Sequence, residues 1–249
     1  MLQTIFGAPN LGLFHRLARL VRPAPADPLL RRNNEFFRSF DQSQPLDNYE
    51  FAVIDTELTG LIPGQDEIVS IGAVRIKGLK LYPSDAFYAL VRPRMDLPKL
   101  STLIHHITPQ EVENAPPLEE VLPGFVEYLG SSLIVAHHVG LDMSFLNRAM
   151  KRGFGAPLHN PCLDTLRLAQ AYQEELFGSY FDHYNYQISY QLGDLARKHD
   201  LPSFSQHNAF SDALQAAYLF LFLVKKLKGG GVRTLKDLHQ VGRVRLINF

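Results

Sequence analysis

Two acids separated by one position end an apolar run in Phe51-Ala52-Val53-Ile54-Asp55-Thr56-Glu57-Leu58-Thr59-Gly60. Four apolar residues in a row are typical of a strand buried on both faces, and we expect that strand to cover residues 51–55. Carboxylates at the end of a buried strand are costly unless their desolvation is offset, and clustered carboxylates usually bind a divalent cation. Taken alone, Asp55 and Glu57 are explained equally well as exposed acids at a strand end.

The segments that follow this strand along the chain first show the pattern of further strands. They then show strands in alternation with helices. The run Thr108-Pro109-Gln110-Glu111 predicts a helix start, because it combines a capping threonine, a proline at the first helical position and an acid three residues after the cap. Strands are also predicted at 67–76, 81–91 and 132–136, and helices at 117–129, 140–150, 164–172, 191–199, 209–228 and 234–240. This order predicts an α/β fold with three layers and a mixed central sheet.

The chain divides into three parts by composition. Residues 1–47 are predicted to form an N-terminal extension and linker, residues 48–228 a compact domain, and residues 229–249 a basic C-terminal tail. Both ends are basic, with six Arg against two acids in residues 1–40 and seven Lys or Arg against one acid in residues 225–249. Basic ends suit a polyanionic partner, although an ordinary solvated surface is the explanation that we favour.

The overall composition limits the class of protein. Hydrophobic residues make up 46% and charged residues 20%, which is compatible with a sizeable core, and the formal net charge is zero. Cys162 is the only cysteine, so a disulfide within the chain or a thiolate zinc site is excluded, as suits a reducing cytosol. No apolar run has the length needed to span a membrane. We therefore expect a cytoplasmic protein without a membrane partner.

Two further acids and a histidine follow predicted turns. Asp142 lies in the first turn of the helix after the strand at 132–136, Asp212 lies near the start of the helix at 209–228, and His207 precedes it on the approach. Each has an ordinary explanation, since aspartate at a helix start is stabilised by the helix dipole and a lone histidine is commonly a surface residue.

Taken together in their order and spacing, these motifs resemble the DEDDh family of 3′→5′ exonucleases. This family belongs to the ribonuclease H-like superfamily and includes the proofreading epsilon subunit of bacterial DNA polymerase III. The resemblance covers residues 48–228 and extends to the turn at 55–60, the segment 67–73 and Asp164-Thr165. Several motifs in register are far more specific than any one of them.

The resemblance implies a ribonuclease H-like fold and a site that binds two Mg²⁺ or Mn²⁺ ions. Paired divalent ions can stabilise the attacking and leaving oxygens of a phosphodiester, and these hard cations prefer carboxylate ligands. By resemblance, Asp55 bridges both metals, Glu57 and Asp212 ligate or position the metal that activates water, and Asp142 holds the second site directly or through water. His207 is the implied general base, a task suited to histidine because its unperturbed pKa lies near neutral pH.

The resemblance also implies substrate contacts by Thr56, Leu58 and His105. Leu58 stands where the family often has threonine, and its larger side chain could pack against the terminal base. His105-His106 stands in place of the family's His-Gly, which makes His105 a candidate for the rim of the substrate site. Ala136-His137-His138 replaces the usual Ala-His-Asn, and no predicted metal ligand is lost.

We expect a metal-dependent 3′→5′ exonuclease that releases nucleoside 5′-monophosphates from single-stranded DNA. An exoribonuclease of the same fold is the nearest alternative, because the metal chemistry does not depend on the sugar. A catalytically silent nucleic-acid-binding scaffold is a second alternative. It is disfavoured by the presence of all four acids and the histidine.

The N-terminal extension contains a possible docking peptide. Asn10-Leu11-Gly12-Leu13-Phe14 resembles the short peptides by which bacterial replication proteins bind the sliding clamp, and residues 23–28 form a proline-rich linker behind it. The segment would then contact a replication clamp or polymerase. Packing of residues 1–22 on the domain as an amphipathic helix is the alternative that we favour.

Overall fold

The computed structural model describes residues 27–177, 189–205 and 207–242. Its sheet has five strands in the order β3-β2-β1-β4-β5. The strands are β1 (Glu50–Leu58), β2 (Ile68–Lys77), β3 (Lys80–Leu90), β4 (Leu133–Ala136) and β5 (Cys162–Asp164). β1 pairs antiparallel with β2 and parallel with β4, so the predicted mixed sheet is confirmed.

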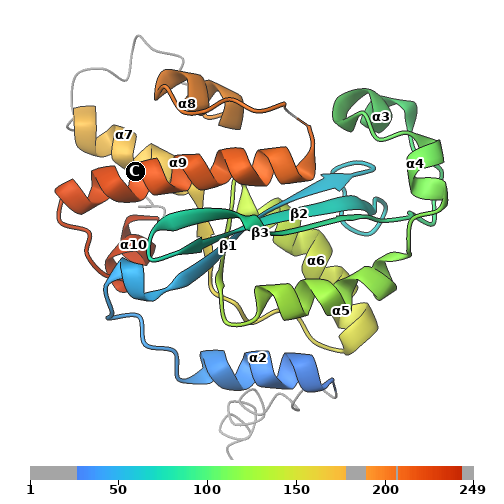
Figure 1. Ribbon diagram of the computed structural model, residues 1–249, viewed down its shortest axis with the longest axis horizontal. Coiled ribbons are helices and arrows are strands. Elements are labelled where there is room, and N and C mark those ends of the chain that lie inside the picture. The colour runs from blue at the N-terminus through green and yellow to red at the C-terminus, as the bar shows by residue number, and fades with distance from the viewer. Residues whose placement is uncertain (1–26, 178–188, 206, 243–249) are drawn as a thin grey trace, which may run out of the picture.

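Helices cover both faces of the sheet, and Figure 1 shows α9 crossing one face while α5 and α6 lie beyond the other. The helices are α2 (Pro28–Arg38), α3 (Lys99–His105), α4 (Pro109–Glu113), α5 (Leu118–Leu129), α6 (Val139–Phe154), α7 (Thr165–Phe177), α8 (Leu192–Lys198), α9 (Ala209–Gly229) and α10 (Leu235–Val241). The predicted three-layer α/β architecture is therefore confirmed. None of the helices in the described part of the chain is long and apolar enough to cross a bilayer.

The apolar run in β1 supplies both cores of the protein. Phe51 and Val53 pack with α7, α9 and α10, whereas Ala52 and Ile54 pack with α5 and α6 on the opposite face. Successive side chains of a strand point to opposite faces, so a continuous apolar run is what a sheet covered on both sides requires.

The structure differs from the sequence-based expectations in the length of β1 and in one helix. β1 continues to Leu58 instead of ending at Asp55, so both acids lie inside the strand. Helix α3 was not predicted, and no side chain caps its start at Pro98. The predicted helix start at Thr108 is confirmed, because Thr108 and Glu111 form a reciprocal capping box.

Packing extends past both predicted limits of the compact domain. Leu30 of α2 is fully buried against the α5 and α6 core, and Leu235 and Leu238 of α10 are fully buried in the α9 core. Helix α10 thus packs apolar side chains against α7 and α9, while the predicted division of the chain into domains stays a prediction. The candidate docking peptide lies outside the described residues and stays a prediction.

Candidate metal centre

Three of the four predicted ligands meet at the end of the central strand. Each of Asp55, Glu57 and Asp212 offers a carboxylate oxygen, and these oxygens lie within 4.8 Å of one another. Asp55 and Glu57 are two positions apart in β1, so their side chains leave the same face of the sheet. The pairing of β1 with β2 shifts between Glu57 and Leu58, and such irregularities are common beside functional sites.

Asp212 reaches β1 because α9 starts directly over a glycine of the neighbouring strand. Gly72 of β2 lies opposite Asp55 in the sheet register. A Cβ atom on Gly72 would lie 2.2 Å from the carbonyl carbon of Ala209, so only glycine leaves room for the first turn of α9. This close approach places Asp212, three residues further along the helix, beside Asp55 and Glu57.

His207 is held to the same cluster through its backbone. Its N–H donates to Oδ2 of Asp212 over 2.8 Å, and its φ of 63° turns the chain into α9. Histidine tolerates this left-handed conformation better than most residues. The side chain of Asn208 caps α9 by accepting a hydrogen bond from Ser211 N–H over 3.1 Å. The imidazole of His207 is exposed beside the carboxylates.

Asp142 lies next to the cluster but outside the group of three. It is buried in the first turn of α6, and Thr56 Oγ1 donates to its Oδ1 over 2.7 Å. The hydroxyl of Thr56 therefore positions an acid here. The sequence had suggested a contact with substrate for Thr56, and that contact stays a prediction.

The other two predicted substrate contacts are also buried. Leu58 is 9% exposed and packs in the α5 and α6 core, and His105 is 4% exposed. The Nδ1 atom of His105 accepts the N–H of Ile107, and its ring lies inside the turn after α3, so its predicted place at the rim of the substrate site stays a prediction. The Nε2 atom of His105 is buried with no hydrogen-bond partner among the described residues.

Burial raises the pKa of Asp55, Glu57, Asp142 and Asp212, and repulsion between these acids adds to the effect at Asp55 and Glu57. Burial raises the pKa of Glu57 to about 7, with the charge of Asp212 adding to it, and raises the pKa of Asp142 to about 7. The pKa of Asp55 lies well above its ordinary value because of burial and then the charge of Asp142. Burial also raises the pKa of Asp212. A divalent cation would offset both effects, so this all-oxygen donor set fits Mg²⁺ or Mn²⁺.

Sequence reasoning missed the residues that shape the approach to the site. Gly72 was part of a quoted motif, but nothing in the sequence showed that a helix would cross it. Tyr88 of β3 is half-exposed, and partial burial raises the pKa of its hydroxyl. A hydrogen bond with the side chain of Asn208 acts in the opposite direction. Tyr88 therefore lies beside the approach to α9. No sequence signal marked it.

A mixed five-stranded sheet with carboxylates on its central strand and on a crossing helix defines a nuclease of the ribonuclease H-like class. The chain belongs to the exonuclease family, whose profile matches residues 52–220, and the resemblance inferred from the sequence is confirmed. Exonucleases of this family depend on divalent metal ions, in keeping with the acid cluster.

Two curated relatives show where such domains occur. The chain is 35% identical over 253 residues to a DNA polymerase III subunit epsilon-like protein of Rhodobacter capsulatus, covering 96% of this chain and 34% of the relative. It is 34% identical over 203 residues to the PolC-type DNA polymerase III of Thermotoga petrophila, covering 82% of this chain and 14% of the polymerase. The chain thus spans about a third of the length of the first relative and about a seventh of the length of the second.

Solved structures of similar fold include two exonucleases bound to DNA. Exonuclease X in complex with 5′ overhanging duplex DNA is 25% identical, with a TM-score of 0.58 over 78% of this chain and 99% of that one. E. coli Exonuclease I in complex with a dT13 oligonucleotide is 18% identical, with a TM-score of 0.63 over 74% of this chain and 42% of that one. The second likeness concerns the fold alone.

The raised pKa values predict a stability that depends on both pH and metal. Unfolded carboxylates lose their protons near pH 4, whereas Glu57 and Asp142 keep theirs in the folded state up to about pH 7. The stability that these two acids contribute to the metal-free protein is therefore lost as pH rises from about 4 to about 7. Because a cation binds the ionised acids, Mg²⁺ should raise the melting temperature more above pH 7 than below pH 6. Scanning calorimetry with Mg²⁺ or EDTA measures this, and an equal rise at both pH values would contradict it.

Proposed function

We propose that the protein is a 3′→5′ exodeoxyribonuclease that removes nucleoside 5′-monophosphates from single-stranded DNA. The observation that carries this proposal is the convergence of Asp55, Glu57 and Asp212 within 4.8 Å, with His207 bound through its backbone to Asp212. The membership of the exonuclease family supports it.

Each residue takes a separate part in the hydrolysis. Bound Mg²⁺ or Mn²⁺, two ions in the proposed site, would stabilise the charge that develops on the phosphate oxygens. Asp55, Glu57 and Asp212 would hold these ions, and Asp142, which Thr56 orients through a hydrogen bond, would complete the site beside them. The imidazole of His207 accepts the proton of the attacking water, and the exposure of the ring leaves it able to pass that proton to solvent.

DNA is the proposed substrate, because Exonuclease X is solved in complex with DNA and the two curated relatives carry the names of DNA polymerase III proteins. RNA is the alternative, and a matched pair of DNA and RNA oligomers of one sequence separates the two. The DNA strand should be shortened faster. A faster loss of the RNA strand would make the protein an exoribonuclease, whereas loss of neither in Mg²⁺ would favour the silent scaffold.

Blocking the 3′ end should abolish degradation. An oligomer with an inverted 3′ nucleotide offers no terminal 3′-hydroxyl nucleotide to the acid cluster, whereas a block at the 5′ end leaves that terminus intact. The rate on the first substrate should fall to background, and the rate on the second should match that of the unmodified oligomer, as followed on a denaturing gel. Efficient cutting of closed single-stranded circles would overturn the exonuclease assignment and indicate an endonuclease.

A further inference from the structure

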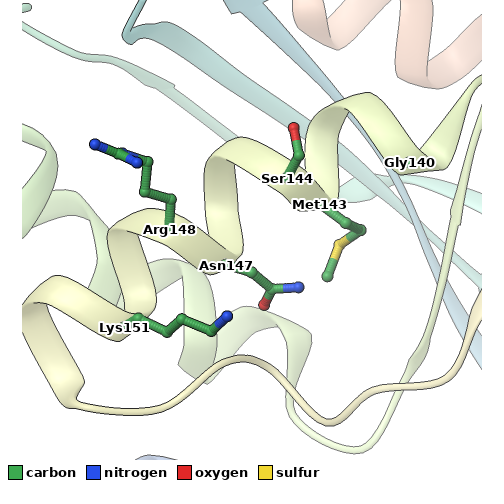
Figure 2. A pocket seen from close by; sticks show the side chains of 6 residues that line it. All are labelled: Gly140, Met143, Ser144, Asn147, Arg148 and Lys151. Atoms are coloured by element: carbon green, nitrogen blue, oxygen red, sulfur yellow. The ribbon is translucent and has the colours of Figure 1, made fainter. Parts of the chain in front are cut away.

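A groove lies along α6 on the side of the helix that faces solvent. It has a volume of about 520 Å³ and is lined by Gly140, Met143, Ser144, Asn147, Arg148 and Lys151, all from this one helix (Figure 2). No carboxylate lines it. The opposite side of α6 packs in the core through residues such as Phe145 and Leu146. The groove therefore shares its helix with Asp142 and is separate from the acid cluster.

Two exposed cations give the groove its charge. Neither Arg148 nor Lys151 forms an ion pair with any residue in the described ranges. The guanidinium of Arg148 lies under the turn between β1 and β2, because a Cβ atom on Gly64 would come within 3.0 Å of its central carbon. That turn follows the strand that carries Asp55 and Glu57. The positive charge of Arg148 is thus held against the segment that leaves the metal centre.

The other polar side chains restrict what the groove can bind. Ser144 Oγ donates to the carbonyl of Leu141 over 2.6 Å, so its proton is used within the helix. Oδ1 of Asn147 accepts the N–H of Leu158 over 2.9 Å, so the part of this amide that can still meet a ligand is its N–H donors. Cations and amide donors without an acid are suited to an anion with several acceptor oxygens.

The spacing along α6 suits the backbone of a nucleic-acid strand. Arg148 and Lys151 follow Asp142 by six and nine residues, which is about 9 and 13.5 Å along a helix that rises 1.5 Å per residue. A stacked strand carries one phosphate per roughly 3.4 Å of its axis. Measured along the axis, these distances correspond to about three to four phosphates. At 3.6 residues per turn, Arg148 and Lys151 lie about 120° and 180° around α6 from Asp142. A strand whose reacting phosphate is at the acid cluster therefore reaches them by passing over the turn between β1 and β2, where Arg148 lies against Gly64.

We propose that this groove binds the backbone phosphates of the substrate strand, about three to four nucleotides from the 3′ end that is cut. The proposal rests on the proposed function, since it takes a strand with its 3′ end at Asp55, Glu57 and Asp212. It assigns Arg148 and Lys151 to strand binding, without a part in the chemical step.

The double variant Arg148→Gln/Lys151→Gln tests this assignment on long and short substrates. Its KM on a long oligothymidylate should rise roughly 5- to 30-fold with kcat unchanged. On dithymidylate, or on the p-nitrophenyl ester of thymidine 5′-monophosphate, KM and kcat should both match wild type, because these substrates are too short to reach the groove. The slope of log KM against log salt on the long oligomer should fall by about 1.4, at 0.7 per lost phosphate contact.

The matched control is Lys225→Gln/Lys228→Gln, which removes the same charge from exposed positions near the end of α9. It should leave KM on the long oligomer within twofold of wild type. Equal effects of the two double variants, or a rise in KM on the short substrates as well, would overturn the groove assignment.

A binding measurement separates this proposal from the proposed function. Anisotropy of a fluorescein-labelled oligothymidylate is recorded with wild type and both double variants in EDTA, where no hydrolysis occurs. Selective loss of binding by Arg148→Gln/Lys151→Gln supports the groove even if the wild type hydrolyses neither substrate, a result that would sink the proposed function alone. Unchanged binding contradicts the groove whether or not the protein is an exonuclease.

Discussion

Replacement of Asp55 by alanine is expected to lower the rate of DNA hydrolysis by at least roughly 10³-fold while the protein stays folded. Asp55 is one of the three acids that would hold the metal ions, and an oxygen of its carboxylate lies within 4.8 Å of oxygens of Glu57 and Asp212. Metal stabilisation of a transferring phosphate contributes several kcal/mol, and about 1.4 kcal/mol corresponds to a factor of ten in rate. Initial rates on a labelled oligomer in saturating Mg²⁺ measure the loss.

Asp55→Asn is the matched variant, because it keeps the shape of the side chain and removes only its charge. It should lose activity nearly as completely as Asp55→Ala. Its metal-free form should also melt several degrees higher than wild type, since burial and the neighbouring acids make an ionised Asp55 unfavourable. Retention of more than a few per cent of the wild-type rate by either variant would show that the metal assignment is wrong.

Replacement of His207 by asparagine is expected to lower the rate roughly 10²- to 10⁴-fold, the usual contribution of a general base. Asparagine tolerates the left-handed backbone of this position, so the approach to α9 should keep its path and its hydrogen bond to Asp212. Binding of Mg²⁺, measured by calorimetry, should change little. The rate of the variant should recover in part as pH is raised, because hydroxide from solution can then act as the nucleophile without a general base.

An unchanged rate in His207→Asn would show that another histidine acts as the general base. His137 does not suit that task, since its Nδ1 is hydrogen-bonded with Thr165 Oγ1 and its Nε2 with the carbonyl of Tyr190, each over 2.9 Å. His138 is exposed at the start of α6 and has a φ of 63°. A second variant, His138→Asn, would then show the larger loss.

The fold was predictable where a local pattern determines it. Burial on both faces followed from the unbroken apolar run in β1, and the start of α4 from the capping box of Thr108 and Glu111. Helix α3 was missed because its N-cap is Pro98, which offers no capping side chain. Its Leu100 and Leu103 are more than 70% exposed, so the usual apolar face was also absent from the sequence pattern.

The acids of the site were predictable from their motifs, but their distances and partners were not. Only the folded chain shows that Gly72 admits the first turn of α9 and so brings Asp212 to Asp55. The hydrogen bond between Thr56 and Asp142 joins residues 86 positions apart, and no local rule reports such a contact. The same holds for the placement of Arg148 beneath the turn at Gly64.

The central claim is that the carboxylates of Asp55, Glu57 and Asp212, together with His207, form the active site of a metal-dependent 3′→5′ exonuclease. The most direct test is the digestion of a 5′-labelled single-stranded DNA oligomer by the purified protein in Mg²⁺. Reactions in EDTA and reactions with Asp55→Asn serve as blanks, that is, as negative controls. The products are resolved by gel electrophoresis and identified by mass spectrometry. The account predicts a ladder of labelled strands shortened from the 3′ end and free nucleoside 5′-monophosphates, both absent from the blanks. Immediate release of labelled mononucleotide from the 5′ end, or equal digestion in EDTA, would contradict it.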